Sequence, residues 1–320
     1  MNVEGIKNKL KGLFSALGIL FVLLFLCVLF AVKAPGFVSV RNLYYVLQQV
    51  SVVGILTIGQ TYVIISKGID LSQGAIIGFS SIMSAILIVN KGLPVWCAFV
   101  IIILAGALIG FINGILIAKL NVPAMIATLG TTNIVSAIAL LSCNGSNIYS
   151  LPASIKAFAS IKLWGFMPGI TCIMFVMFIV AYIALMKTKF GRYTYAIGSN
   201  ELSARFSGIR VTRHLISVYT ISGIVSAVAG VIMVCRLNSG VATAGDGYEM
   251  NSIAAVVIGG GSLFGGEGSI IGSLVGALIM SVLSNGLQLM GISTYWQKLF
   301  VGVVLIGAVV IDNLRRKKMS

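Results

Sequence analysis

The sequence is dominated by apolar runs long enough to cross a lipid bilayer, and they recur along most of its 320 residues. A helix needs about 20 residues to cross a hydrocarbon layer of roughly 30 Å. Closed β-barrels would instead show short segments of alternating polarity, which the sequence lacks. Only 9% of the residues are charged, against about 25% in a soluble domain. We therefore predict an all-α polytopic membrane protein embedded in a lipid bilayer.

Ten runs qualify as candidate transmembrane helices. The eighth is too short to cross as a simple helix, so we expect it to be broken or re-entrant and packed within protein. The first resembles a signal peptide but is too long and lacks a small-residue cleavage site, so we interpret it as an uncleaved span. The whole chain, residues 1–320, is then one transmembrane domain. The ten runs are residues 13–32, 43–65, 74–90, 95–118, 124–142, 167–186, 214–235, 251–264, 270–290 and 296–313.

Basic residues beside the spans predict the orientation, because cytoplasmic loops carry an excess of Lys and Arg. Lysines between residues 7 and 11 and the basic run 315–318 place both termini in the cytoplasm. Ten spans then place residues 187–213, which are also rich in Lys and Arg, on the same side. This topology accounts for the net charge of +15, so we expect no nucleic-acid partner.

Two spans share a glycine spacing that hints at internal duplication. Glycines four residues apart clear one face of a helix for close approach by another backbone. We predict two inverted repeats of four to five spans, with candidate repeat units 43–142 and 214–313, a common transporter plan. Small-residue packing is also frequent in membrane helices, so the spacing alone leaves the duplication open. The glycines are Gly106, Gly110 and Gly114 in the fourth span and Gly268, Gly272 and Gly276 in the ninth.

A charged island, GRYTYAIGSNELSARFSGIRVTR (residues 191–213), interrupts the apolar sequence with five charged residues in 23 positions. Read as a helix near residues 200–207, it places Leu202, Phe206 and Ile209 on one apolar stripe. Isolated helices below about 12–15 residues are marginal in water, so something must bury this stripe. The membrane end of this chain, the lipid headgroups and a separate cytoplasmic subunit are the alternatives.

The polar residues of the island also fit a short helix. Glu201 and Arg205 are four residues apart in the favourable order, and Glu201 suits the positive end of the helix dipole. Ser199 or Asn200 can cap the N-terminus. Gly208 can end the helix. The island is therefore expected to hold one helix of about two turns.

Several motifs together resemble permease subunits of ATP-binding-cassette importers for ribose and related monosaccharides, within the branched-chain-type binding-protein-dependent transport permease family. The similarity covers nearly the full length, and the motifs are specific as a set. They are YAIGSNELSARFSGI followed by VYTISGIVSAVAGVIMV, GIDLSQGAIIGFSS (68–81), NVPAMIATLGT (121–131) and DGYEMNSIAAVVIGGGSLFGGEGSIIGSLVGA (246–277).

The resemblance implies that loop 187–213 holds a coupling helix that docks into a groove of a cytoplasmic ATP-binding subunit. Leu202 and Ser203 replace the usual Ala-Ala pair, which affects the detailed contacts but not the role. Further implied partners are an extracytoplasmic sugar-binding protein, a second permease copy in a homodimer, and a small neutral sugar. The bacterial cytoplasmic membrane is the implied location. The predicted coupling residues are Glu201, Ala204, Arg205, Phe206 and Gly208.

The sequence contains no motif for nucleotide chemistry or catalysis. It has no GxxxxGK[ST] phosphate loop, and the glycine run GGGSLFGGEG (259–268) is interpreted as a kinked span end or a tight cytoplasmic turn. Seven acidic residues and one histidine, His214, form no metal-binding or catalytic set. The cysteines have no CxxC spacing. We expect no enzymatic activity, no metal and no cofactor, with ATP used by the partner subunit.

Polar residues in spans are candidates for the translocation path, since burying them in a membrane is costly. A neutral sugar needs amides and hydroxyls, although each such residue is more often a helix–helix hydrogen bond. Asp70 could instead cap a helix beginning near Leu71, with Lys67 as its partner. Loop charges at Lys156, Lys162, Arg236, Asp246 and Glu249 are candidates for docking the sugar-binding protein. The candidates for the path are Gln49, Gln60, Asp70, Asn113, Thr131, Asn133 and Asn251.

An ion-coupled or facilitative small-solute carrier is the alternative function. Proton coupling normally uses buried carboxylates or histidines. Asp70 and His214 are the residues that this chain offers for that role. A permease driven by another subunit and a self-sufficient carrier therefore differ in whether the protein can transport alone.

Overall fold

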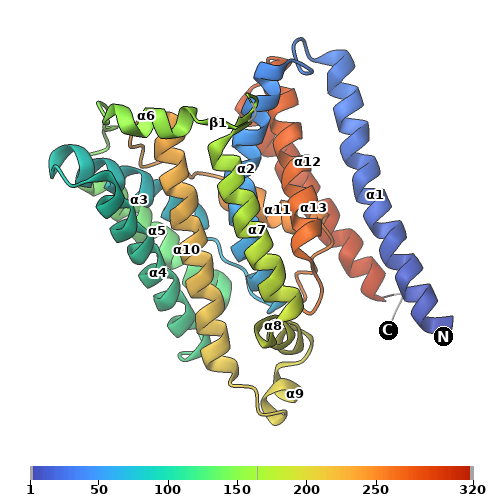
Figure 1. Cartoon of the computed structure of the whole chain (residues 1–320). Helices are drawn as coiled ribbons and strands as arrows, with labels where there is room; N and C mark the ends of the chain where they lie inside the picture. The colour runs from blue at the N-terminus through green and yellow to red at the C-terminus, as the bar shows by residue number, and fades with distance from the viewer. Residues whose placement is uncertain (1–2, 164, 318–320) are drawn as a thin grey trace.

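The computed structural model describes residues 3–163 and 165–317, and these are almost wholly helical (Figure 1). Every predicted span overlaps a helix. The elements are α1 (Val3–Lys33), α2 (Val40–Ile65), α3 (Gln73–Ala85), the π-helix η1 (Ile86–Asn90), α4 (Val95–Ala118), α5 (Ala124–Ser142), α6 (Ala153–Ser160), β1 (Lys162–Leu163), β2 (Met167–Pro168), α7 (Gly169–Lys187), α8 (Lys189–Ser199), α9 (Glu201–Phe206), α10 (Val211–Leu237), α11 (Tyr248–Ile258), α12 (Ile270–Leu289) and α13 (Thr294–Lys317).

Seven of the described helices are long and apolar enough to cross a membrane: α2, α3 continued by η1, α4, α5, α7, α10 and α12. Helix α11 and the segment Gly18–Lys33 of α1 are apolar but shorter. The chain is therefore a multi-pass, all-α membrane protein, as predicted, apart from the two-residue strands β1 and β2.

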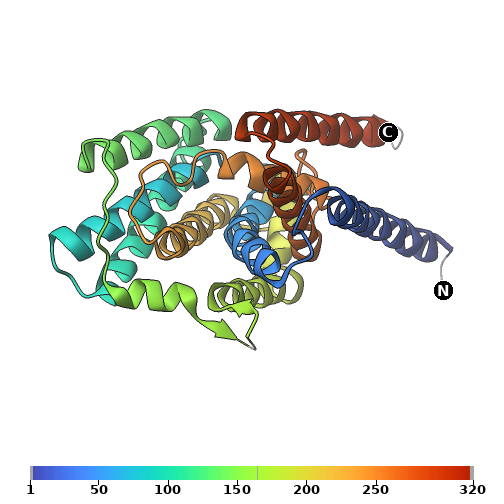
Figure 2. The same cartoon turned by 90° about the horizontal axis from the view of Figure 1, so that it is seen from above.

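Helices α2 and α10 form the centre of the bundle (Figure 2). The most apolar window of α2 is 94% buried and that of α10 78%, whereas that of α5 is only 22% buried. Glycines bring the central helices close to their neighbours. A Cβ on Gly59 would lie 2.8 Å from the Ser222 Cα of α10, and one on Gly54 would lie 2.7 Å from the Met174 Sδ of α7. Small residues therefore place α2 in the middle, while α5 presents apolar side chains outward.

The glycine spacing predicted for close packing has that effect in both spans. A Cβ on Gly106 would lie 2.7 Å from the Gly223 carbonyl oxygen of α10, and one on Gly110 would clash with the same helix. Gly272 and Gly276 instead approach the backbone of Gly259 and α11. In the predicted duplication, the equivalent of α10 is α2 and not α11. The two sets of glycines therefore do not contact equivalent helices, and the spacing indicates close packing only.

Helices α3 and α11 are short because a non-helical segment already runs inside the bundle before each of them begins. The eighth span, predicted to be broken, is the 11-residue helix α11, which follows the non-helical segment 238–247. The third span was predicted as an ordinary helix. It is instead the 13-residue α3 with a π-helical end, preceded by residues 66–72, which turn back from the end of α2 into the bundle (Figure 1). The sequence prediction missed this second break.

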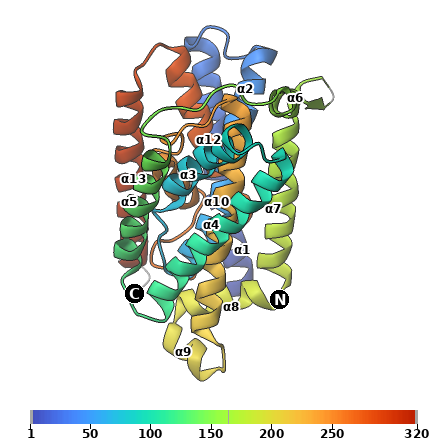
Figure 3. The same cartoon turned by 90° about the vertical axis from the view of Figure 1, so that its left-hand side faces the viewer.

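Helices α8 and α9 lie beyond one end of the bundle, called here the α9 end. Helix α1 begins and α13 finishes on this side (Figure 3), so the two helices place their outer ends on the same side of the bundle; Lys318 of the predicted basic run lies outside the described residues. The opposite end, called the α6 end, carries α6 and the antiparallel strands β1 and β2. The sequence prediction treated α6 and α8 as parts of loops.

Candidate functional site

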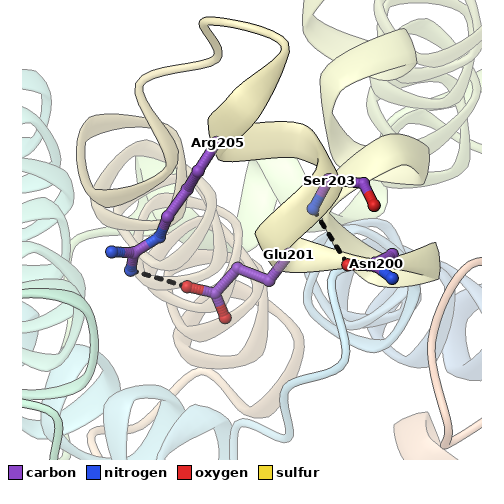
Figure 4. Close-up of polar contacts among 4 residues, drawn as sticks. All are labelled: Asn200, Glu201, Ser203 and Arg205. Carbon is purple, nitrogen blue, oxygen red and sulfur yellow. Dashed lines mark hydrogen bonds and ion pairs between the residues drawn. The ribbon is translucent and has the colours of Figure 1, made fainter.

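Helix α9 begins and pairs its charges as the sequence predicts (Figure 4). Asn200 is the N-cap, and its Oδ1 accepts a hydrogen bond from the backbone N–H of Ser203 at 2.9 Å. The Arg205 guanidinium donates to Glu201 Oε1 at 2.7 Å. Both charged side chains are about half exposed, at 52% and 49%. An ion pair this exposed contributes about 1 kcal/mol or less to stability.

Helix α9 is terminated by a complete Schellman motif, in which Gly208 is the residue after the C-cap. Gly208 has a φ of +79°, which an L side chain rarely adopts. Its N–H donates to the Arg205 carbonyl oxygen at 3.0 Å, and the Ile209 N–H donates to that of Ala204 at 3.1 Å. These two bonds satisfy carbonyls that the short helix would otherwise leave free. The predicted helix stop is confirmed.

The described residues leave two of the three members of the predicted apolar stripe uncovered, whereas Ile209 packs beside Ala204. Ala204 is 3% exposed and packs with Ile197 of α8 and Val211 of α10, which attaches the helix to the bundle. Leu202 and Phe206 face outward, 68% and 90% exposed. A six-residue helix is therefore held on one side by the chain and presents an uncovered apolar pair on the other.

A buried polar network connects the break before α3 to four other helices. Asp70 accepts three hydrogen bonds, from the Ser72 N–H at 2.9 Å and from the hydroxyls of Ser72 and Ser222 at 2.6 Å each. The Gln73 side chain donates to the Ser222 hydroxyl at 3.0 Å and accepts from the Ser252 hydroxyl at 2.8 Å. These five residues lie in the break itself and on α3, α10 and α11, and all are buried.

The network extends to α4 and α5 through an amide. Asn113 donates to the Ser72 hydroxyl at 3.0 Å and accepts from the Thr131 hydroxyl at 2.5 Å. Asp70 is fully buried and is bonded to N–H and hydroxyl groups; among the described residues it has no salt bridge, and Lys67 is exposed. The N-cap of α3 is Ser72, and Asp70 fixes the turn that precedes it. The predicted cap by Asp70 of a helix beginning near Leu71 is therefore wrong, because α3 begins at Gln73 and has Ser72 as its N-cap.

A cavity of about 630 Å³ lies between α2, α11, α12 and α13. It is in the half of the bundle away from the α9 end, since Gln49 lies in the first half of α2. The lining combines amide and hydroxyl groups with apolar side chains, the usual composition of a small-molecule site. Its lining residues are Gln49, Val53, Asp246, Gly247, Tyr248, Glu249, Met250, Asn251, Met280, Ser284, Thr294, Gln297, Lys298, Val301, Gly302 and Leu305.

Charged residues also line this cavity. Asp246 and Glu249 contribute carboxylates, and Lys298 of α13 contributes an ammonium group. Glu249 was predicted in an outer loop as a docking charge. It lies instead in the first turn of α11, where its carboxylate packs against Gly74 of α3. The prediction was wrong because α11 begins before the apolar run that marks it in the sequence.

The residues predicted for the translocation path fall into four settings. Gln49 and Asn251 line the cavity. Asp70, Asn113 and Thr131 belong to the polar network and are not among the cavity-lining residues. Gln60 is fully buried, and neither its amide oxygen nor its nitrogen has a hydrogen-bond partner among the described residues. Asn133 is exposed on α5. The alternative reading, a helix–helix hydrogen bond, therefore applies to Asn113 and Thr131.

The sequence prediction missed most of the groups that complete these sites. Ser72, Gln73 and Ser222 were not singled out, because serines and glutamines are scattered through the spans without a periodic signal. Lys298 and Gln297 were overlooked because they lie at the start of the last apolar run. A search for polar residues in apolar runs finds such groups, but it does not show which of them meet.

Comparison with known proteins identifies the family. Residues 42–309 match the family described as branched-chain amino acid transport system / permease component, and the chain belongs to this family of transport permeases. It is 41% identical to the ribose import permease protein of Bacillus subtilis over 100% of both chains. The corresponding protein of Escherichia coli K12 is 39% identical over 93% of both. The predicted resemblance is confirmed.

The relatives also include permeases named for other sugars. A fructose import permease protein of Rhizobium meliloti is 40% identical, with coverage of 93% of this chain and 85% of that protein. No solved structure matches the chain. The family and the full-length similarity are thus established from sequence relatives.

Proposed function

We propose that this chain is the membrane-spanning permease subunit of an ATP-binding-cassette importer and forms the translocation path for a monosaccharide. Relatives named as ribose and fructose import permeases support the cargo class. The observation that carries the proposal is the uncovered Leu202–Phe206 pair on α9. ATP hydrolysis then belongs to a separate cytoplasmic subunit, and the permease is not an enzyme and holds no cofactor.

Helix α9 is suited to a protein groove. It projects beyond the ends of the spanning helices (Figures 1 and 3), which favours a soluble partner over the lipid headgroups. Its exposed apolar pair is flanked by Glu201 and Arg205, the mixture of an apolar centre and a polar rim found in protein interfaces. Since Ala204 fastens the other side of α9 to the bundle, movement of the groove would move the helix.

The cavity is the proposed path for the sugar. Gln49, Asn251 and Gln297 provide amides and Ser284 a hydroxyl, which match the donors and acceptors of a neutral sugar. A site of this kind needs no counter-ion. The sugar-binding protein would deliver its cargo at the α6 end, where Lys156 and Lys162 remain candidates for docking.

A second copy of the chain would cover the open side of the path. Charged cavity residues such as Lys298 are costly to expose to hydrocarbon. Helices α5 and α13 lie along one edge of the bundle (Figures 2 and 3), and the exposed amide of Asn133 is on α5. A homodimer formed along this edge would shield both features and place the path between two permeases.

The topology proposed from the sequence completes this arrangement. Ten spans place both termini and the α9 end in the cytoplasm, in the bacterial cytoplasmic membrane. The inverted repeats 43–142 and 214–313 are supported by reciprocal packing, because α4 packs on α10 while α12 packs on α2. The breaks before α3 and α11 occupy matching places in the two units.

The test is reconstitution in vesicles with the ATPase subunit and the sugar-binding protein, using radiolabelled ribose as the probe. Glu201→Lys and Gly208→Pro should abolish uptake while membrane insertion stays normal. Proline fixes φ near about −65°, whereas Gly208 requires +79°. Gly18→Ala, at a glycine of α1 with open space around it, is the control and should transport normally.

Two results would contradict the proposal. If the permease alone accumulates ribose without ATP or partner subunits, the chain is a carrier. If both α9 variants transport normally, α9 is not the coupling helix. The carrier alternative is not favoured by the relatives, which are named as import permeases.

A further inference from the structure

Helix α8 meets the rest of the protein through glycines. A Cβ on Gly198, near the end of α8, would clash with the Ile65 carbonyl oxygen at the end of α2 and would lie 2.7 Å from the Gly266 nitrogen. The Gly266 N–H donates to that same Ile65 oxygen at 2.8 Å. Three backbones therefore converge at one point without intervening side chains.

The third backbone is the glycine-rich loop between α11 and α12. Gly265 and Gly266 have φ values of +84° and +79°, conformations that favour glycine. A Cβ on Gly265 would lie 2.8 Å from the Gly198 carbonyl oxygen and 2.7 Å from the Lys67 Cβ. We call Gly198, Ile65, Gly265 and Gly266 the glycine joint.

One side-chain hydrogen bond reinforces the glycine joint. The Tyr195 hydroxyl of α8 donates to the Gly268 carbonyl oxygen, just before α12, at 2.7 Å. Helices α8 and α9 are themselves linked directly, because Asn200 is the C-cap of α8 and the N-cap of α9. Helices α8 and α9 are therefore separated by Asn200 alone.

We propose that the glycine joint transmits movement of α9 to the cavity, a role that rests on the proposed function and adds its internal linkage. The joint holds the end of α2 and the loop that connects α11 to α12. Helices α2, α11 and α12 are three of the four helices that line the cavity, and they contribute Gln49, Asn251 and Ser284 to it. Close-packed backbones transmit displacement because they have no flexible side chain to absorb it.

Two pairs of variants test the joint in the reconstituted complex. Gly198→Ala forces α8 away from α2, and Tyr195→Phe removes only the hydroxyl bond to Gly268. The controls are Gly18→Ala, at a glycine with open space around it, and Tyr193→Phe, whose hydroxyl makes no hydrogen bond within the described residues. The measurements are retention of the ATPase subunit on purification, ATP hydrolysis, and labelled ribose imported per ATP.

We expect both joint variants to keep the ATPase subunit and ATP hydrolysis, while ribose imported per ATP falls by about tenfold for Gly198→Ala and less for Tyr195→Phe. The controls should match the wild type. If Gly198→Ala does not fold, the comparison of Tyr195→Phe with Tyr193→Phe tests the proposal by itself. Equal ratios for Tyr195→Phe and Tyr193→Phe would overturn the joint. A wild-type complex that imports nothing would instead count against the proposed function.

Discussion

Helix α9 and the buried network around Asp70 both contain a carboxylate, but the two are stabilised in opposite ways. Glu201 has a cationic partner, Arg205, at 2.7 Å, and both are about half exposed. Asp70 is fully buried and is held by three hydrogen bonds from uncharged groups. Water replaces a lost partner on α9, whereas nothing replaces one in the interior. The carboxylate on α9 is thus accessible to a partner, whereas the one in the network is bonded only within the fold.

The two regions also differ in the distance along the chain between bonded residues. The bonds of α9 join residues three or four positions apart. In the network, Asp70 and Ser72 are also close in sequence, but the bonds that link different helices join residues 18 to 179 positions apart. The network therefore forms only when the helices pack, and it should fail as a unit. The four predictions below test this contrast.

The largest effect is expected for Asp70→Ala. It leaves the Ser72 N–H and the hydroxyls of Ser72 and Ser222 buried without their acceptor, at about 1–3 kcal/mol for each unsatisfied group. Thermal unfolding in detergent should show a large loss of stability or no folded protein. Asp70→Asn, which keeps one oxygen acceptor, should be intermediate. Wild-type stability in Asp70→Ala would show that the network does not support the fold.

A smaller loss is expected for Thr131→Val, which keeps the shape of the side chain but removes the donor to Asn113 Oδ1. The cost should be about 1–2 kcal/mol in unfolding free energy. A double-mutant cycle with Asn113→Leu should show clear coupling, because the second change removes the stranded acceptor. Strictly additive effects would mean that the bond contributes nothing to stability.

Removing the N-cap of α9 by Asn200→Ala should lower the stability of α9 alone. Loss of an N-cap costs about 1 kcal/mol, but here it frays six residues outside the bundle. We expect faster hydrogen exchange in residues 201–207, reduced ribose uptake and an unchanged global unfolding temperature. Ser207→Ala, which removes a hydroxyl at the C-terminal end of α9 and leaves the N-cap Asn200 in place, is the control. A fall in global stability would place α9 in the cooperative core.

The smallest change in stability is expected for Arg205→Ala. The exposed pair with Glu201 contributes about 0.5 kcal/mol or less, so the unfolding temperature should not shift measurably. Binding of the ATPase subunit should nevertheless weaken, because Arg205 flanks the exposed Leu202–Phe206 pair. A binding assay with the purified ATPase subunit checks this. A variant that is destabilised but binds normally would reverse the contrast between the two regions.

The sequence by itself determined the class of protein and the local form of α9. Apolar runs must become spanning helices because a bilayer offers no hydrogen bonds to the backbone, so every predicted span overlaps a helix. The cap at Asn200 and the stop at Gly208 depend on neighbours within a few residues. Glycines four residues apart likewise indicated close packing before any partner helix was known.

Only the tertiary structure decided which polar groups meet. Asp70 and Ser222 are 152 positions apart, and no periodicity in either segment indicates the other. The break before α3 was missed because the local bonds between Asp70 and Ser72 do not mark a break by themselves, and the bond from Ser222 comes from a distant helix. Seven residues predicted for one path were divided among a cavity, a network, an enclosed site and an outer face. Burial depends on the positions of all the helices together, and a linear pattern of polarity does not encode those positions.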